Sequence, residues 1–165
     1  MSDKSAILSP CGRYRWILER GLAGAGPVVA TLGVNPSTAD AEIDDQTIRK
    51  DKGFGERLGW SRIIKVNKFA WRATDVRELA KAVDPIGTEN DRYIADAFGR
   101  ADIILFAYGP LAKLPKRLRR RWLEIAMIAD RAGKPIFCLG TANDGHPRHT
   151  LMLPYDTRLL RWERP

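Results

Sequence analysis

The chain has 165 residues, 44% of them hydrophobic, and its 28 Lys and Arg against 20 Asp and Glu give a net charge of +8. This length fits one domain over residues 1–165, with a buried core. No apolar run approaches the roughly 20 residues that span a bilayer, and the first residues lack the basic-then-apolar pattern of a secretory signal. The two cysteines lie far apart without metal-like spacing, so we expect a reduced, cytoplasmic protein.

The first half of the chain predicts three strands and a helix. Residues 13–20 alternate in a strand-like way, and residues 28–34 form an apolar, β-branched run bounded by prolines. These two segments are expected to pair as a hairpin. A helix should begin near Asp44 or Asp45, either of which can cap its exposed N–H groups. The run "RIIKVN", residues 62–67, predicts a second buried strand.

The second half of the chain predicts three more helices. Asp75 followed by Glu78 has capping-box spacing and opens a short helix, and Thr88 followed by Asp91 opens another. Residues 116–133 predict a longer helix that ends at a glycine.

Two further apolar runs, residues 102–109 and 134–140, predict the last central strands. The alternation of short apolar strands with helices favours an α/β fold. We expect a three-layer α/β/α sandwich with a mostly parallel central sheet of about four strands plus an N-terminal β-hairpin. The last 15 residues are expected to pack across the end of this sheet.

Polar and aromatic side chains gather where the predicted strands end. Ligands bind beyond the carboxyl ends of the strands in open parallel sheets, so we expect one pocket at this edge. Each residue taken alone could be a turn or core residue, but their convergence favours a site. The residues expected around it are Asn35, Ser37, Thr38, Asn67, Phe69, Trp71, Arg72, Tyr108, His146 and His149.

Four acids, Asp40, Glu42, Asp44 and Asp45, precede the first predicted helix. Carboxylates could bind a divalent metal, but negative charge near a helix N-terminus is favourable by itself. We interpret the acids as capping and expect no metal. Phosphate-loop, dinucleotide-binding and hydrolase-elbow motifs are also missing, so we expect no cofactor.

The excess of positive charge favours a polyanionic partner, nucleic acid or a nucleotide, and no membrane, although many basic proteins bind no nucleic acid. Six of the nine residues 113–121 are Lys or Arg. Cations are unfavourable in the first turns of a helix unless an anion or nearby carboxylates compensate them. This segment is therefore either a phosphate-binding surface or a solvated, internally paired one. The predicted nucleic-acid-binding residues are Lys116, Arg117, Arg119, Arg120 and Arg121.

Three blocks of the sequence, "LGVNPSTADAEIDDQTIRK", "VNKFAWRATD" and "GTANDGHPRHTLMLP", resemble the signature blocks of a bacterial family catalogued as a domain of unknown function. More distantly, the chain resembles the uracil-DNA glycosylase superfamily. The turn at residues 33–36 is similar to that superfamily's Gly-X-Asp-Pro or Gly-X-Asn-Pro motif. Asn67 stands where some members have a base-recognising Asn, and His146 with the following proline resembles the last motif.

The resemblance implies a glycosylase-like protein that binds a base, or hydrolyses its N-glycosidic bond, in nucleic acid or a nucleoside. It implies that Asn35 orients a water, Asn67 pairs with the base edge, Phe69 or Trp71 stacks on the base, and His146 stabilises the departing anion. One alternative is a non-catalytic nucleic-acid or nucleotide-binding module on the same fold. Another is a small-molecule enzyme acting on a phosphorylated nucleoside.

Overall fold

The structure is a computed structural model that describes residues 3–165. Its seven-stranded sheet has the order β1-β2-β4-β3-β5-β6-β7. The strands are β1 (Lys4–Leu8), β2 (Arg15–Gly21), β3 (Val28–Gly33), β4 (Arg62–Asn67), β5 (Ile103–Phe106), β6 (Ile136–Cys138) and β7 (Leu160–Arg161). The α-helices are α1 (Gln46–Leu58), α2 (Asn90–Arg100) and α3 (Arg121–Ala132), and the 3-10 helices are η1 (Val76–Lys81), η2 (Leu111–Lys113) and η3 (Lys116–Leu118).

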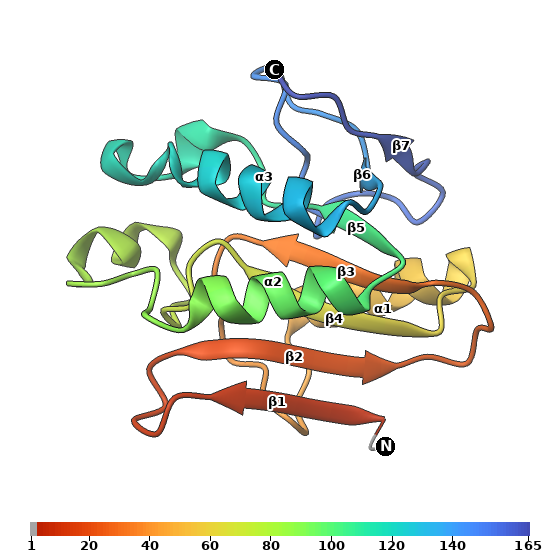
Figure 1. Cartoon of the computed structure of the whole chain (residues 1–165), viewed down its shortest axis with the longest axis horizontal. Helices are drawn as coiled ribbons and strands as arrows, with labels where there is room; N and C mark the ends of the chain where they lie inside the picture. The colour runs from red at the N-terminus through yellow and green to blue at the C-terminus, as the bar shows by residue number, and fades with distance from the viewer. Residues whose placement is uncertain (1–2) are drawn as a thin grey trace.

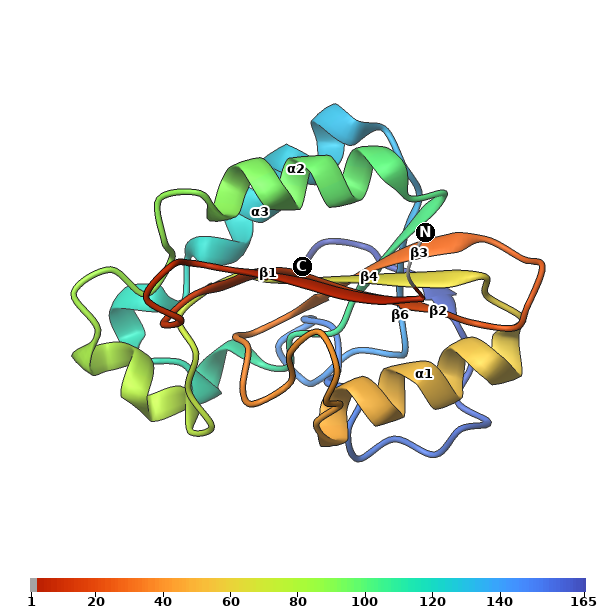
Figure 2. The ribbon, with the colours of Figure 1, turned by 90° about the horizontal axis from the view of Figure 1, so that it is seen from below.

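Helices cover both faces of the sheet. Helices α2 and α3 lie on one face and α1 lies on the other (Figure 2), while β1 and β2 form one edge of the sheet (Figure 1). The core accordingly has two main parts. Phe98 and Phe106 belong to the cluster under α2 and α3, and Phe54 and Trp60 belong to the cluster under α1. The α/β class predicted from the sequence is therefore confirmed.

The directions of the strands differ from the prediction. The ladder β4-β3-β5-β6 is parallel, whereas β1 with β2, β2 with β4 and β6 with β7 are antiparallel. Three of the six pairings are thus parallel, and the expectation of a mostly parallel sheet of about four strands is wrong. The added strands are hard to see in the sequence, because β7 has only two residues and β1 is half-exposed.

The predicted hairpin between residues 13–20 and 28–34 is also wrong. Strand β3 is hydrogen-bonded on both sides by parallel strands, β4 and β5, so it has no free edge for β2. Strand β2 lies between β1 and β4 instead. Its first four side chains are buried, which fits a strand with a neighbour on each side.

The predicted caps of two helix starts and the predicted end of a third helix are confirmed. The Asp45 carboxylate accepts a hydrogen bond from the Ile48 N–H at the start of α1. Asp75 caps η1 by accepting from the Arg77 N–H. Gly133 ends α3 in the left-handed conformation at φ +67°, which a glycine adopts without strain.

Two predicted helix starts are wrong. The chain forms the short η3 after Pro115, and α3 begins only at Arg121. This irregular path brings Leu118 into a core cluster with Phe69, Leu79 and Leu114. Helix α2 begins at Asn90, and its first residues receive no side-chain cap from Thr88. Among residues 3–165, none of the helices is long and apolar enough to cross a membrane.

Candidate functional site

A cavity of about 820 Å³ lies at the carboxyl ends of β3, β4 and β5. This volume is within the range of small-molecule sites. Its walls come from the loop after β3, the first turn of α1, the segment after β4 and the segment around residue 149. Six of the predicted site residues line it, namely Asn35, Ser37, Thr38, Asn67, Tyr108 and His149.

His146 does not line this cavity. The ring is buried, with 4% of its surface exposed, and packs edge-on against Trp122. Its Nδ1 lies 2.9 Å from the Tyr108 hydroxyl, and Tyr108 does line the cavity. Burial is the main cause that lowers the pKa of His146 below its ordinary value. His146 therefore reaches the cavity only through the tyrosine that it holds.

Three other predicted site residues also lie outside the cavity. Phe69 is fully buried in a core cluster. Trp71 and Arg72 line a second, more open hollow of about 410 Å³. The Arg72 guanidinium donates to the backbone carbonyls of Gly12, Ser37 and Thr38. Arg72 therefore holds the loop after β3 in place.

The Gly-Val-Asn-Pro turn is tied to the segment after β4 by Asn35. The Asn35 Nδ2 donates to the carbonyls of Pro36 and Ala73, at 3.1 and 2.8 Å. Its Oδ1 has no hydrogen-bond donor among the described residues, so this oxygen is the group left for a ligand or a water.

The absence of a side chain at Gly33 makes space for the side chain of Asn67. A Cβ at Gly33 would lie 2.7 Å from the Asn67 Oδ1, too close for van der Waals contact. Asn67 is 3% exposed, and its side-chain amide has no hydrogen-bond partner within residues 3–165. The amide lines the cavity. An amide in a cavity wall without a partner in the protein is a group that can recognise a ligand, because it offers both hydrogen-bond donors and an acceptor.

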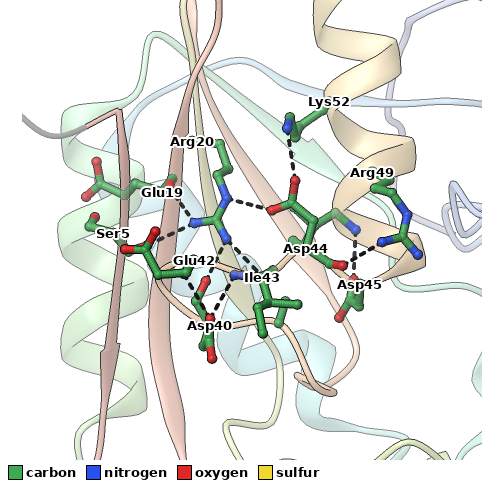
Figure 3. A network of polar contacts seen from close by, with 12 residues as sticks. Ser5, Glu19, Arg20, Asp40, Glu42, Ile43, Asp44, Asp45, Arg49 and Lys52 are labelled. Atoms are coloured by element: carbon green, nitrogen blue, oxygen red, sulfur yellow. Dashed lines mark hydrogen bonds and ion pairs between the residues drawn. The ribbon is translucent and has the colours of Figure 1, made fainter.

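In the acidic segment before α1, the Asp44 carboxylate and the Asp40 backbone contact Arg20 (Figure 3). Arg20 is 1% exposed; its Nε donates to the Asp44 Oδ1 at 2.7 Å, and its Nη2 donates to the Asp40 carbonyl. Lys52 pairs with the other oxygen of Asp44. The Asp40 side chain accepts from two backbone N–H groups of its own loop. These acids therefore shape the loop, while Asp45 caps the helix.

A buried polar triad lies near the cavity on the α1 face of the sheet. Lys65 Nζ pairs with Asp51 Oδ2 at 2.8 Å, and Thr150 Oγ1 donates to Asp51 Oδ1 at 2.8 Å. All three residues are at most 3% exposed. The sequence analysis missed this triad, although a lysine inside the apolar run "RIIKVN" was a visible signal. Lys65 also lines the cavity.

His149 presents a neutral imidazole to the cavity. Burial is the largest cause that lowers its pKa to about 4, and the positive charge of Lys65 lowers the pKa further. Its Nδ1 accepts a hydrogen bond from the Leu151 N–H at 3.1 Å. The proton of the neutral ring is therefore on Nε2, which makes Nε2 the hydrogen-bond donor of a cavity-lining side chain.

The basic segment is largely paired within the protein. Arg121 is buried and pairs with Asp91 and Glu124, so it cannot contact a nucleic-acid phosphate as predicted. Arg117 donates to backbone carbonyls at the end of η1 and just after it, and Arg119 donates to the Ala112 and Leu114 carbonyls. Of the six cations in residues 113–121, Lys113, Lys116 and Arg120 are exposed and have no side-chain hydrogen bond or ion pair among the described residues.

The residues that line the cavity lie within the range that a family model matches. A family model described as "Protein of unknown function (DUF1643)" matches residues 15–151. The chain belongs to this family. Every residue that lines the cavity lies within this range, and its first and last residues, Arg15 and Leu151, are themselves part of the lining. Neither the comparison with curated proteins nor the comparison with solved structures found a match to the chain.

Proposed function

We propose that this protein binds a nucleobase-bearing compound in the cavity and hydrolyses its N-glycosidic bond. The observation that carries the proposal is the presence of the neutral His149 ring and the unpartnered Asn67 amide in one cavity. An amide offers both donors and an acceptor, which suits the mixed edge of a base. A neutral imidazole N–H can stabilise the negative charge that develops on a departing base.

The reaction breaks the bond between the sugar's anomeric carbon and the base nitrogen, and the bonding electrons leave with the base. Water supplies a hydroxyl to the sugar carbon, and its proton goes finally to the base. In this cavity the Asn35 Oδ1 is an acceptor for orienting the water, and the His149 Nε2–H is a donor for the departing anion. The role that the sequence suggested for His146 is thus assigned to His149.

The resemblance to the uracil-DNA glycosylase superfamily supports the same proposal. The parallel ladder β4-β3-β5-β6 has four strands, as the sheet of that superfamily does. The turn at residues 33–36 follows β3, Asn67 ends β4, and His146 follows β6. This is the order of that superfamily's motifs, and we include a uracil-DNA glycosylase-like fold in the proposal.

A binding module without turnover is the second candidate, because the acids of the cavity are already engaged. Asp44 forms two ion pairs, Asp45 caps α1, and Asp75 pairs with Arg77. None of them is free to act as a strong general base. A weak base suffices only if the bond to the base ionises ahead of the water's attack, as in an oxocarbenium-like transition state.

The test is a base-release assay. Nucleosides, nucleoside monophosphates and uracil-containing single-stranded and duplex DNA are incubated with the protein, and free base is quantified chromatographically. We expect release from at least one compound, with a loss of roughly a hundredfold in His149→Gln. Arg120→Gln, which changes an exposed residue outside the cavity, is the control and should keep the activity. Saturable binding of a base-bearing compound without any base release would favour the binding module.

A further inference from the structure

A buried arginine without a carboxylate partner lies in the wall of the cavity. Arg15 is 3% exposed; its Nη1 donates to the Ala39 carbonyl at 2.9 Å, and its Nε has no hydrogen-bond acceptor. It forms no ion pair among the described residues. Burial is the largest cause that lowers the pKa of Arg15 to about 10, and the charges of Asp45 and Asp40 oppose it without pairing with the side chain, so the guanidinium still carries its charge at neutral pH. A buried cation of this kind is costly unless an anion compensates it.

The first turn of α1 adds hydrogen-bond donors to the same cavity. This helix has 13 residues, and its cap Asp45 satisfies the Ile48 N–H. The N–H groups of Gln46 and Thr47 have no acceptor within the described part of the chain, and both residues line the cavity. Unpaired N–H groups together with the helix dipole make a helix N-terminus an anion-binding site.

The charges of the cavity wall also favour an anion. Arg49 and Lys113 line the cavity, and neither forms an ion pair among the described residues. The acids of the wall are compensated from elsewhere. Asp44 pairs with two cations and Asp75 with one, all outside the lining, and Asp45 lies on the positive end of the helix. The wall therefore keeps an excess of positive charge.

We propose that Arg15 and the first turn of α1 form a phosphate subsite, so that the compound taken into the cavity is a nucleoside monophosphate. The assignment of the base rests on the function proposed above, whereas phosphate binding requires no hydrolysis. The burial of Arg15 favours the terminal phosphate of a free nucleotide. A phosphodiester inside a polymer could reach this buried side chain only if the nucleotides on both sides of it also entered the cavity.

The experiment compares inorganic phosphate, a nucleoside and its 5′-monophosphate by titration calorimetry. Because hydrogen bonds to charged groups are strong, the monophosphate should bind roughly ten- to a hundredfold more tightly than the nucleoside. Arg15→Met keeps the apolar stem and removes the guanidinium, and it should reduce this preference to about threefold or less. Arg120→Gln removes one exposed cation outside the cavity and should leave the preference unchanged.

A second measurement needs no variant and so does not depend on how Arg15→Met folds. Addition of inorganic phosphate to the wild-type protein should shift the amide signals of Gln46 and Thr47 in NMR spectra. Unshifted amides, equal affinity for the nucleoside and its monophosphate, or an unchanged preference in folded Arg15→Met would each overturn the subsite. A single-stranded oligonucleotide that displaces phosphate at lower concentration than the monophosphate does would overturn the choice of a free nucleotide.

The two proposals fail separately. A phosphate preference that depends on Arg15, without release of base, would support the subsite and contradict hydrolysis. Base release with no preference for the monophosphate would support hydrolysis and overturn the subsite.

Discussion

Replacement of Asp51 by Asn should leave Lys65 buried without its counter-charge. The two side chains are 1% and 3% exposed, and their charged atoms lie 2.8 Å apart. Asparagine has nearly the same shape as aspartate, and its Oδ1 can still accept the hydrogen bond that Thr150 donates to Asp51. The change therefore removes mainly one negative charge from a buried ion pair.

The expected loss in the free energy of unfolding is roughly 3–5 kcal/mol, the usual cost of removing one partner of a buried pair. This is a large part of the ~5–15 kcal/mol that stabilises an ordinary domain. Removing the second charge as well, in Asp51→Asn with Lys65→Met, should recover much of the loss, because no unpaired charge then stays buried.

Urea unfolding of the two single variants and the double variant measures this coupling. Asp75→Asn is the matched control, because Asp75 pairs with Arg77 at 2.7 Å but Arg77 is 85% exposed. Asparagine can keep the cap of η1 and the exposed pair is screened by water, so the control should lose much less stability than Asp51→Asn does. A loss in Asp51→Asn as small as in the control, or losses that simply add in the double variant, would refute the reasoning.

Three further substitutions test other parts of the structure. Asp45→Ala removes the cap of α1 and should lower the free energy of unfolding by ~1 kcal/mol, measured by urea unfolding; an unchanged value would contradict the capping role. Gly33→Ala places a Cβ 2.7 Å from the Asn67 Oδ1, so it should weaken binding of a base-bearing ligand in calorimetry. Lys68 is buried with no hydrogen-bond partner for its Nζ among the described residues, and burial lowers its pKa to about 7. The unfolded chain keeps this proton up to its ordinary pKa of ~10.4, so stability should rise between about pH 7 and pH 10, and Lys68→Met should flatten that rise.

Local patterns in the sequence predicted much of the fold. The cap at Asp45 and the helix end at Gly133 could be predicted because each residue acts on the helix next to it in the sequence. Strand pairing was not visible in the same way. Whether β2 pairs with β3 or β4 depends on which edge is free once β3 has neighbours on both sides. That is a property of the whole sheet, and no short run of residues carries it.

The location of the candidate site could be predicted from the sequence better than the residues that line it. Asn35 follows β3 and Asn67 is the last residue of β4, so the rule that parallel strands end at the same edge places both at one cavity. The sequence could not show which of the two histidines lines the cavity. His146 is kept out of it by contacts with Tyr108 and Trp122, which are distant from it in the sequence. Arg15 was missed because its burial depends on the loop that ends at α1.

The most direct test of the proposed base site is the state of the two histidine rings. NMR of the ring nitrogens should show His149 as the neutral Nε2–H form from pH 5 to pH 7, because its pKa is lowered to about 4. Addition of a nucleoside monophosphate should shift the His149 Nε2 signal, and the His146 signals should move much less. A His149 ring that titrates near pH 6.5, or one that the nucleotide leaves unchanged, would contradict the proposal.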